Sequence, residues 1–338
     1  MSDSTPTLRD PNDAALGHTL VIRPGALGDA ILTLPALHAL RLAGAASLTV
    51  LGTPASWAFV RLAHDGLRVR DFSSTEWLGL FAEGARLGAS AKAALARTQT
   101  AIVYLNGDTA YVERIMREHG VQRILCAPAP TAQSVDSTVH ASARMLEPLS
   151  IFPEISAQLN RAIRITTVAA DPFLATDETD VVHALAKLGC DAAPEGGFFA
   201  LHPGSGGRAK CWPARNYAKL LANLSARGMT PLVFFGPADD EVREDFESSV
   251  APGLDWECPA GRPLREVLAL LTCCRGFVGN DSGMAHLAAR ACPTLALFGP
   301  TDPAVWSPLG KNVQILRAPN GDLARLSVED VAEKAMNF

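Results

Sequence analysis

Short apolar runs alternate with helix-like segments along two stretches of the chain, and this alternation constrains the fold more than any other feature of the sequence. The runs expected as strands are residues 19–23, 48–51, 101–105 and 121–125 in the first stretch, and 198–202, 230–235, 276–278 and 294–298 in the second. Apolar positions at helical spacing lie between them, for example Ile31, Leu34 and Leu37. Strand and helix in alternation predict a parallel sheet covered by helices on both faces. We therefore expect an α/β protein with two Rossmann-like domains that face each other across a central cleft.

The length of 338 residues suits two domains, each with its own core. The alternating pattern weakens between residues 128 and 175, where the prolines are Pro128, Pro130, Pro148, Pro153 and Pro172. We expect a flexible tail at 1–17, an N-terminal Rossmann-like domain at 18–170 and a C-terminal Rossmann-like domain at 171–338. For the last helix we keep the option that it packs back on the N-terminal domain.

The net charge of −5 argues against a general nucleic-acid-binding protein, which would carry a surplus of basic residues. Seven cysteines without a Cys-x-x-Cys or a Cys/His ligand spacing indicate neither a disulfide framework nor a zinc site. The polar N-terminus lacks the features of a signal peptide, and no apolar run reaches the roughly 18 residues that span a bilayer. We expect a cytoplasmic protein, associated at most peripherally with the cytoplasmic face of the inner membrane.

Arginine dominates the basic residues of the first half of the chain. It supplies 14 of the 15 basic residues in positions 1–165. Arginine grips phosphate and carboxylate groups with a planar fork, which suits an anionic ligand. A coding bias toward alanine and arginine explains the excess more simply, and we give it more weight.

Ligands of open parallel sheets bind beyond the carboxyl ends of the strands, so the turns that follow strands are the candidate sites. The first such turn is Arg-Pro-Gly-Ala-Leu-Gly-Asp at residues 23–29. Gly25 and Gly28 allow a tight turn, which puts Asp29 at a helix start with its carboxylate directed into a cleft. A plain helix N-cap is the alternative for Asp29. The turn does not match G-x-G-x-x-G, which argues against a dinucleotide site.

The second turn comes close to the phosphate-binding pattern G-x-x-x-x-G-K-[ST] of P-loop proteins. Ala209 replaces the second glycine, and Cys211 replaces the hydroxyl residue that would hold magnesium, which argues against a kinase or an ATPase. What remains is a glycine-rich loop with two cations beside it, and its residues include Ser205, Gly206, Arg208 and Lys210. Such a loop suits a phosphate, and a simple turn is the alternative.

The third turn, at residues 277–286, leads from a buried strand into the start of a helix. The first N–H groups of a helix have no intrahelical partner and carry the positive end of its dipole, so they favour phosphate. Gly283 lets a ligand approach the backbone, and the polar side chains at the same end are Asp281, Ser282 and His286. The alternative is that Asp281 or Ser282 only caps the helix.

Two acidic residues, Asp240 and Glu241, follow another expected strand. They are weak candidates for accepting the hydroxyl groups of a donor ribose. An acidic first turn that suits the helix dipole explains them slightly better. No Asp-x-Asp pair occurs in the chain, so we expect no metal held against a sugar diphosphate. The charge of such a leaving group would then be met by Lys210 and by helix N–H groups.

Taken in order, the three turns resemble the motifs of the ADP-heptose:lipopolysaccharide heptosyltransferases of glycosyltransferase family 9. The matching segments lie between about residue 19 and residue 310, and they are 23–29 with 34–37, 202–205 with 210–213, and 279–286 with 298–303. The resemblance implies a GT-B fold, in which the N-terminal domain takes the acceptor and the C-terminal domain takes the nucleotide sugar. It also implies an inverting, metal-independent transfer.

The resemblance assigns roles to individual residues. Asp29 falls on the catalytic base, and Gly25 and Gly28 fall in the acceptor loop. Lys210 falls on the lysine that contacts the diphosphate and assists catalysis, and Asp281 on the contact to the donor sugar. The remaining residues of the donor site are Ser205, Gly206, Ser282, Gly283, Met284 and His286.

The expected function is transfer of a sugar, heptose from ADP-heptose, to a lipopolysaccharide-core-type or other saccharide acceptor, free or lipid-linked, without a further cofactor. One alternative is a transferase or epimerase that uses another nucleotide sugar, such as a UDP-sugar. A second is a catalytically silent nucleotide-sugar-binding protein. An NAD oxidoreductase is third, and the missing G-x-G-x-x-G disfavours it.

Overall fold

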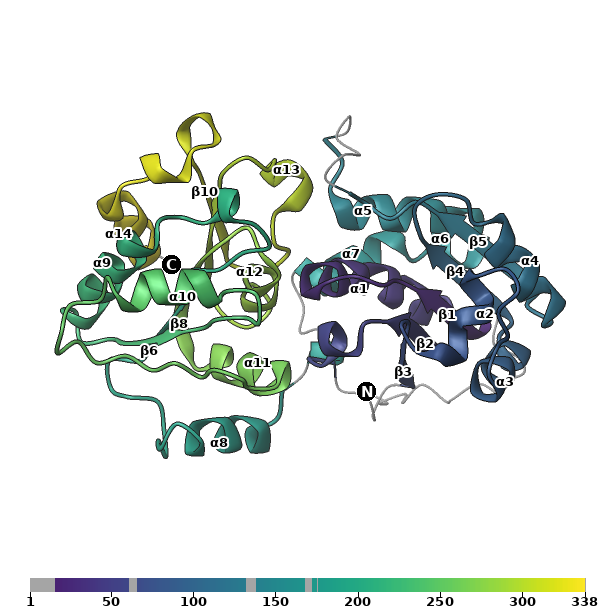
Figure 1. Ribbon diagram of the computed structural model, residues 1–338, viewed down its shortest axis with the longest axis horizontal. Helices are drawn as coiled ribbons and strands as arrows, with labels where there is room; N and C mark the ends of the chain where they lie inside the picture. The colour runs from purple at the N-terminus through teal and green to yellow at the C-terminus, as the bar shows by residue number, and fades with distance from the viewer. Residues whose placement is uncertain (1–15, 61–65, 132–137, 168–171, 175, 338) are drawn as a thin grey trace, which may run out of the picture.

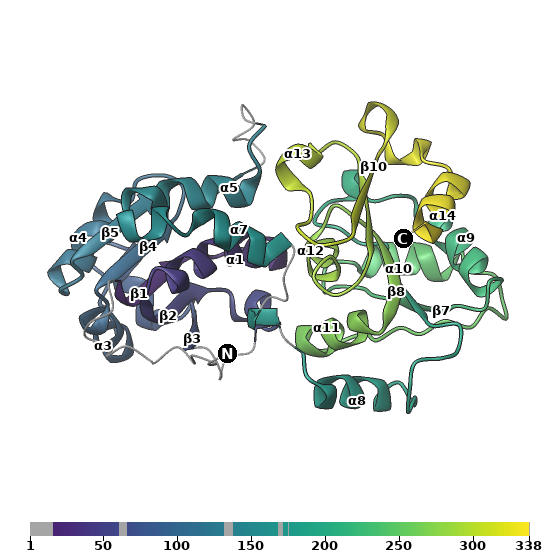
Figure 2. The same cartoon turned by 180° about the vertical axis from the view of Figure 1, so that it is seen from behind.

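The computed structural model describes residues 16–60, 66–131, 138–167, 172–174 and 176–337. Figure 1 shows these residues in two lobes, each with a sheet in its middle. Figure 2, the view from behind, shows the same side-by-side arrangement, with α1 and α12 on the sides that face each other.

The N-terminal lobe is built on a five-stranded sheet in the order β3-β2-β1-β4-β5, in which every pairing is parallel. Its strands are β1 (Gly17–Ile22), β2 (Ala45–Gly52), β3 (Leu67–Asp71), β4 (Thr100–Tyr104) and β5 (Arg123–Ala127). Its helices are α1 (Leu27–Leu42), α2 (Leu78–Phe81), α3 (Ala89–Arg97), α4 (Ala110–Glu118), α5 (Ala141–Leu146), α6 (Pro153–Ser156) and α7 (Leu159–Thr167). Every residue of β4 is buried, as expected for a strand with helices on both faces.

The C-terminal lobe repeats this plan with a parallel sheet in the order β10-β9-β8-β6-β7. Its strands are β6 (Phe198–His202), β7 (Thr230–Val233), β8 (Cys274–Asn280), β9 (Thr294–Phe298) and β10 (Val313–Arg317). Its helices are α8 (Glu178–Ala186), α9 (Ala214–Ser225), α10 (Asp240–Glu247), α11 (Leu264–Thr272), α12 (Gly283–Ala288), α13 (Pro303–Trp306) and α14 (Val328–Met336). The predicted α/β class with two parallel sheets is confirmed.

The sequence prediction missed two strands, and both lie at the edge of a sheet. They are β3, with the sequence Leu-Arg-Val-Arg-Asp, and β10, with the sequence Val-Gln-Ile-Leu-Arg. A strand at an edge has one open side and commonly carries charged residues there. The continuous apolar run that identifies a central strand is therefore missing from both.

The two lobes share one apolar core. The largest cluster of buried side chains includes Leu34 and Leu37 of α1 together with Ala285 and Ala288 of α12, and α1 packs against α12. Each lobe has a second cluster on the other face of its sheet. Because the cluster is continuous across α1 and α12, the starts of these two helices have fixed positions relative to each other.

The structure bears on the predicted domain limits at three places. Leu16 is buried and Gly17 begins β1, so these two residues belong to the N-terminal lobe and not to the expected tail, whose residues 1–15 lie outside the described residues. The boundary between 170 and 171 also lies outside the described residues and stays a prediction. The last helix, α14, packs against α9, β8 and β9 of its own lobe, which differs from the option that it packs back on the N-terminal domain.

Candidate active site between the two lobes

The starts of α1 and α12 meet where the two lobes face each other. A Cβ atom added to Gly283, the first residue of α12, would stand 2.8 Å from the backbone nitrogen of Gly28 and 2.9 Å from Cβ of Leu27. A Cβ atom on Gly28 would stand 3.5 Å from Cα of Gly283. Glycine at position 283 therefore permits the first and third predicted turns to approach each other across the lobes.

Asp29 lies in the first turn of α1, at the mouth of this contact. Its Oδ1 accepts a hydrogen bond from Nη2 of Arg23 at 2.6 Å, and its Oδ2 accepts one from the backbone N–H of Ala26 at 2.9 Å. Ala26 is the N-cap of α1, so Asp29 is the third residue of the helix and not the N-cap considered as an alternative. Its side chain remains 32% exposed, which leaves the carboxylate accessible from the cleft.

Gly25 is required by the position of Asp29. Its φ of +140° lies in a region that favours glycine, and an added Cβ atom would stand 2.5 Å from Oδ2 of Asp29. The guanidinium of Arg23 is buried and also donates to the carbonyl of Pro24 at 2.9 Å. The turn thus fixes the Asp29 carboxylate from two sides.

Lys210 faces this region from the other lobe, in the short turn that follows β6. Its Nζ lies 2.9 Å from Oδ2 of Asp281, and the hydroxyl of Thr301 donates to the same oxygen at 2.7 Å. The Asp281 side chain is only 8% exposed, whereas that of Lys210 is 37% exposed. The cation is therefore paired with a buried carboxylate while part of its own side chain stays exposed.

The second and third predicted turns are held together by Asn280, the last residue of β8. Its Nδ2 donates to the carbonyls of Pro203 and Gly204 at 2.7 and 3.1 Å, and its Oδ1 accepts the backbone N–H of Trp212 at 2.9 Å. The hydroxyl of Ser205 adds a bond to the carbonyl of Asp281 at 2.8 Å. The glycine-rich loop is therefore fixed against the start of α12.

Ser282 is the N-cap residue of α12 by position, but its side chain does not cap the helix. Its Oγ lies instead 3.3 Å from Nδ1 of His202, and Nε2 of His202 lies 3.2 Å from Oδ2 of Asp239. Burial raises the pKa of Asp239, but the hydrogen bond and the charge interaction with His202 outweigh it and lower that pKa overall. An Asp239 carboxylate that accepts from Nε2 leaves Nδ1 as the acceptor for the Ser282 hydroxyl.

His286 lies in α12 beneath the cleft and links the predicted residues electrostatically. Burial lowers its pKa from 6.5 to about 4, the Asp281 and Asp29 carboxylates oppose this shift, and His140 and Lys210 reinforce it. Its Nδ1 is buried without a hydrogen-bond partner. The charges that act on the pKa of His286 thus come from both lobes, Asp29 from one and Asp281 and Lys210 from the other.

His140 joins the lobes on the same side, and the sequence analysis did not single it out. Its Nε2 lies 2.8 Å from the carbonyl oxygen of Ser307, and its Nδ1 accepts the N–H of Ser142 at 3.3 Å. Burial lowers the pKa of His140, although the bond to Ser307 opposes the shift. This histidine lies in the proline-rich stretch where the strand and helix pattern weakens, so periodicity gave no signal for it.

A pocket of about 590 Å³ opens between the lobes, and Asp29, Lys210, Asp281 and His286 are not among the residues that line it. Six predicted residues line it: Gly28, Ser205, Gly206, Ser282, Gly283 and Met284. The residues that the sequence analysis missed include Ala55, Ser56 and Ala58 from the N-terminal lobe, and His202, Pro237, Ala238, Asp239, Arg262, Pro263 and Leu264 from the C-terminal lobe. For Arg262, Pro263 and Leu264, the sequence signal is the glycine and proline at 261–263. Glycine and proline indicate a turn here, but they do not indicate a ligand.

The predicted ribose contacts find no support in this geometry. Neither Asp240 nor Glu241 lines the pocket, and the Glu241 side chain is 79% exposed and pairs with Arg208. The acidic residue of this segment that does line the pocket is Asp239. It is already bonded to the N–H of Gly236 at 2.6 Å and to His202.

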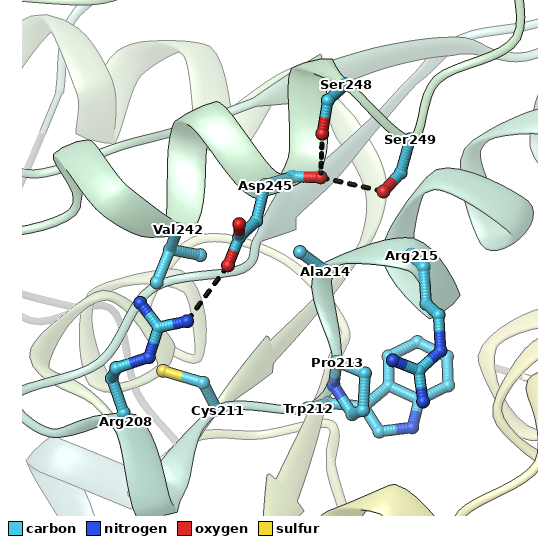
Figure 3. Close-up of a pocket in the computed structure, with 10 residues that line it drawn as sticks. All are labelled: Arg208, Cys211, Trp212, Pro213, Ala214, Arg215, Val242, Asp245, Ser248 and Ser249. Atoms are coloured by element: carbon cyan, nitrogen blue, oxygen red, sulfur yellow. Dashed lines mark hydrogen bonds and ion pairs between the residues drawn. The ribbon is translucent and has the colours of Figure 1, made fainter.

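Arg208, considered with Lys210 as a phosphate ligand, points elsewhere. Figure 3 shows its guanidinium directed at Asp245 of α10, in a separate pocket of about 400 Å³ on the C-terminal lobe. Its Nη1 and Nη2 lie 2.6 and 2.9 Å from Glu241 and Asp245. Of the two cations in the glycine-rich turn, only Lys210 faces the carboxylate of Asp281.

Two further properties of the described residues bear on function. None of the helices that the structure describes is both long and apolar enough to cross a bilayer. Within the same residues, no three or more His, Cys, Asp and Glu side chains are grouped so that they could hold a metal ion.

Comparison with solved structures identifies the fold. The "Structure of E. coli ADP-heptose lps heptosyltransferase II" superimposes with a TM-score of 0.69 at 19% identity and covers 95% of this chain and 97% of that one. "E. coli heptosyltransferase WaaC with ADP" gives a TM-score of 0.62 at 18% identity and covers 95% and 99% of the two chains. The two facing parallel sheets are therefore those of the GT-B class, as predicted.

Sequence comparison shows which family the C-terminal part resembles. Residues 174–336 match the family model described as glycosyltransferase family 9 (heptosyltransferase). Lipooligosaccharide heptosyltransferase 2 of Haemophilus ducreyi is 31% identical over 173 residues, which are 48% of this chain and 50% of that protein. The chain thus spans about half the length of this curated relative, and smaller shares of others. The C-terminal part of the chain is therefore similar to glycosyltransferase family 9, which confirms the resemblance read from the three turns.

Proposed function

We propose that the chain is a glycosyltransferase that moves a sugar from a nucleotide sugar to a saccharide acceptor of the lipopolysaccharide core, with heptose from ADP-heptose as the donor. The observation that carries the proposal is the meeting of the starts of α1 and α12 at one pocket of about 590 Å³, which Gly28, Ser205 and Gly283 line. Asp29 directly follows Gly28 and offers a base, and Lys210 pairs with Asp281 directly before Ser282 and offers a cation. A base and a cation next to the pocket lining suit the displacement of a charged leaving group. The names of the relatives, which are heptosyltransferases, support the choice of sugar.

In the proposed reaction Asp29 acts as the general base. Its carboxylate takes the proton from an acceptor hydroxyl, the oxygen of that hydroxyl bonds to the anomeric carbon, and the bond from that carbon to the diphosphate breaks. Attack on the face opposite the leaving group inverts the anomeric configuration. Arg23 and the N–H of Ala26 orient the carboxylate, and its exposed lone pairs accept the proton.

Lys210 meets the charge of the departing diphosphate. Its Nζ has three donors, of which one is directed at Asp281, so the remaining donors are available to phosphate oxygens. Ser205, Gly206 and the N–H groups at Gly283 and Met284 complete the proposed donor site. In this proposal the protein supplies the positive charge, so that transfer does not require a metal ion.

The chain of hydrogen bonds from Asp239 through His202 positions Ser282 for the donor. With Nδ1 of His202 as acceptor, the Ser282 hydroxyl hydrogen points away from the cleft, and the oxygen lone pairs face it. We therefore propose His202 as a positioning residue that sets which way Ser282 presents its hydroxyl.

The pocket walls suit a nucleoside on the side away from Asp29. Pro237, Ala238, Pro263 and Leu264 form an apolar surface there, and a nucleobase can lie against such a surface. The similar structure "E. coli heptosyltransferase WaaC with ADP" supports an adenine nucleotide as the donor for this chain. A lipid-linked acceptor would bring the chain to the cytoplasmic face of the inner membrane, where we propose that it acts.

The deciding experiment offers purified protein a panel of nucleotide sugars, with calorimetry of ADP and UDP in parallel. We expect ADP to bind more tightly than UDP, and ADP-heptose with a heptose-deficient core acceptor to give a product with inverted linkage. Product from a UDP-sugar alone would replace the donor assignment. Tight nucleotide-sugar binding without product from any donor and acceptor would favour a silent binding protein instead.

A further inference from the structure

A second pocket, of about 500 Å³, lies in the N-terminal lobe away from the cleft. It is lined by the beginnings of β1 and β2, by β3 and by α3. His18 and Thr19 of β1 lie at its wall, whereas the cleft pocket begins with Ala26, beyond the opposite end of the same strand. The two pockets therefore lie at opposite ends of β1.

The register of the edge strands places two arginines on the wall of this pocket. Thr49 of β2 stands opposite Arg68 of β3, and Leu51 stands opposite Arg70. Side chains alternate between the faces of a strand, so Arg68 and Arg70 share the face that looks toward α3, while Leu67 lies in the core on the other face. Across the pocket α3 presents alanines, whose small side chains leave the space open, and a third arginine, Arg97.

The charges in this pocket are all of one sign. Among the residues that the structure describes, Arg68, Arg70 and Arg97 have no ion pair or hydrogen-bond partner, and no carboxylate lines the pocket. The nearby Glu76 is engaged by the N–H of Ser90 at 2.9 Å at the start of α3. Other arginines of the described residues do have carboxylate partners, for example Arg23 with Asp29 and Arg208 with Glu241 and Asp245.

Three guanidinium groups around one hollow repel each other unless an anion lies between them. Each carries a planar fork of donors that matches phosphate oxygens, and the hydroxyl residues Ser47 and Thr49 of β2 and Ser90 of α3 also line the pocket. We propose that this pocket binds a phosphorylated, multiply charged anion at a site separate from the cleft. The phosphoryl group belongs either to a soluble metabolite or to the headgroup of a membrane lipid, since both present the same chemistry to the three arginines.

The test compares anion binding by the full chain and by an Arg68→Gln/Arg70→Gln/Arg97→Gln variant at fixed ionic strength. Inorganic tripolyphosphate is titrated in a calorimeter, and vesicles of phosphatidylglycerol and phosphatidylcholine are used for co-sedimentation. The matched control is Arg114→Gln/Arg117→Gln/Arg243→Gln, which removes three arginines that pair with glutamates on exposed helix surfaces. Lys210→Ala separates this site from the cleft.

We expect the Arg68→Gln/Arg70→Gln/Arg97→Gln variant, the pocket variant, to bind tripolyphosphate at least tenfold more weakly than the wild type. The control variant and Lys210→Ala should both retain the tripolyphosphate site that the pocket variant lacks. Loss of vesicle binding in the pocket variant alone would assign the ligand to a lipid headgroup, and tripolyphosphate binding without vesicle binding would assign it to a soluble anion. If the triple variant unfolds, Thr49→Glu places a carboxylate beside Arg68 and should give the same loss. Equal affinity of wild type and pocket variants for both probes would overturn the proposal.

Discussion

The Nζ of Lys210 lies 2.9 Å from Oδ2 of Asp281, a carboxylate that is 8% exposed and that also accepts the hydroxyl of Thr301. This ion pair joins the glycine-rich turn after β6 to the start of α12. It holds the cation at the edge of the cleft before any ligand enters. The two residues therefore form a prearranged half of the donor site.

Replacing Lys210 by alanine should weaken ADP binding by about tenfold or more, because one charge-assisted hydrogen bond contributes about 1.5–3 kcal/mol. Turnover should fall as well, since the same cation faces the leaving group. Calorimetry with ADP measures the first effect and steady-state kinetics the second. Lys187→Ala, which removes a surface lysine paired with Glu266, is the control. Wild-type ADP affinity in the Lys210 variant would contradict the placement of this cation.

An Asp29→Asn variant should keep nucleotide binding and lose most of its turnover. An amide cannot take the proton of the acceptor hydroxyl, and a general base contributes about 10²–10⁴-fold to the rate. ADP affinity should stay within about twofold of wild type, because Asp29 lies on the acceptor side. Asp330→Asn serves as the control, since Asp330 lies in the first turn of α14, far from the cleft pocket. Transfer at the wild-type rate would remove Asp29 from the role of base.

A Gly283→Ala variant should separate the starts of α1 and α12. The added methyl would stand 2.8 Å from the backbone nitrogen of Gly28, so the backbone must shift. Overpacking of this kind costs about 1–3 kcal/mol. Gly207→Ala is the matched control, because a Cβ atom there meets nothing within 4 Å and the backbone is extended. We expect lower thermal stability and lower activity for the first variant only, and equal melting curves would show that the contact is less tight than it appears in the structure.

Stability should fall as the pH is lowered from about 6.5 toward 4, and His286 should account for part of the loss. Its pKa in the folded state is about 4, below the ordinary 6.5, so the unfolded chain takes up the proton first. The difference corresponds to about 3 kcal/mol once the pH is below both values. His140, whose pKa is also lowered, acts in the same direction.

Denaturant titrations between pH 4 and 7 measure this dependence. A His286→Gln variant should show a flatter pH profile than the wild type, whereas His183→Gln, on the exposed side of α8, should not differ from it. Identical profiles for wild type and His286→Gln would mean that burial does not suppress protonation of this imidazole.

Variants of His202 should separate its two hydrogen bonds. The amide of asparagine reaches the position of Nδ1 and can still bond Ser282, whereas that of glutamine reaches the position of Nε2 and can still bond Asp239. If His202 acts through Ser282, His202→Asn should retain a lower KM for the nucleotide sugar than His202→Gln, with kcat changed less in both. Equal KM values for the two variants would limit His202 to a structural role.

The strands at the centre of each sheet were predictable because both of their faces are buried. Residues 101–105 and 294–298 are nearly continuous apolar runs, and β4 and β9 occupy almost the same positions. The edge strands β3 and β10 were missed because one side of each is open and carries charged residues. Register and pairing with a neighbour, which the local sequence does not contain, decide that these segments are strands.

The candidate site was predictable to the extent that it follows strands. Gly28, Ser205, Gly206, Ser282, Gly283 and Met284 lie in turns after strands or in the first turn of the helix that follows, and all line the cleft pocket. His202 and Asp239 were passed over, since neither differs in sequence from an ordinary strand end or helix start. Their roles come from a hydrogen-bonded chain between segments that are 37 residues or more apart in sequence.

By itself the sequence determined the α/β class, the two parallel sheets and the three turns that carry glycine, cation and carboxylate, because each of these depends on neighbouring residues. Only the tertiary structure decided that Lys210 faces Asp281 while Arg208 turns away to Glu241 and Asp245. It also decided that Gly28 and Gly283 meet, since their contact depends on how two lobes pack. The physical reason is that direction and distance between remote side chains follow from packing of the whole core, which short-range periodicity does not encode.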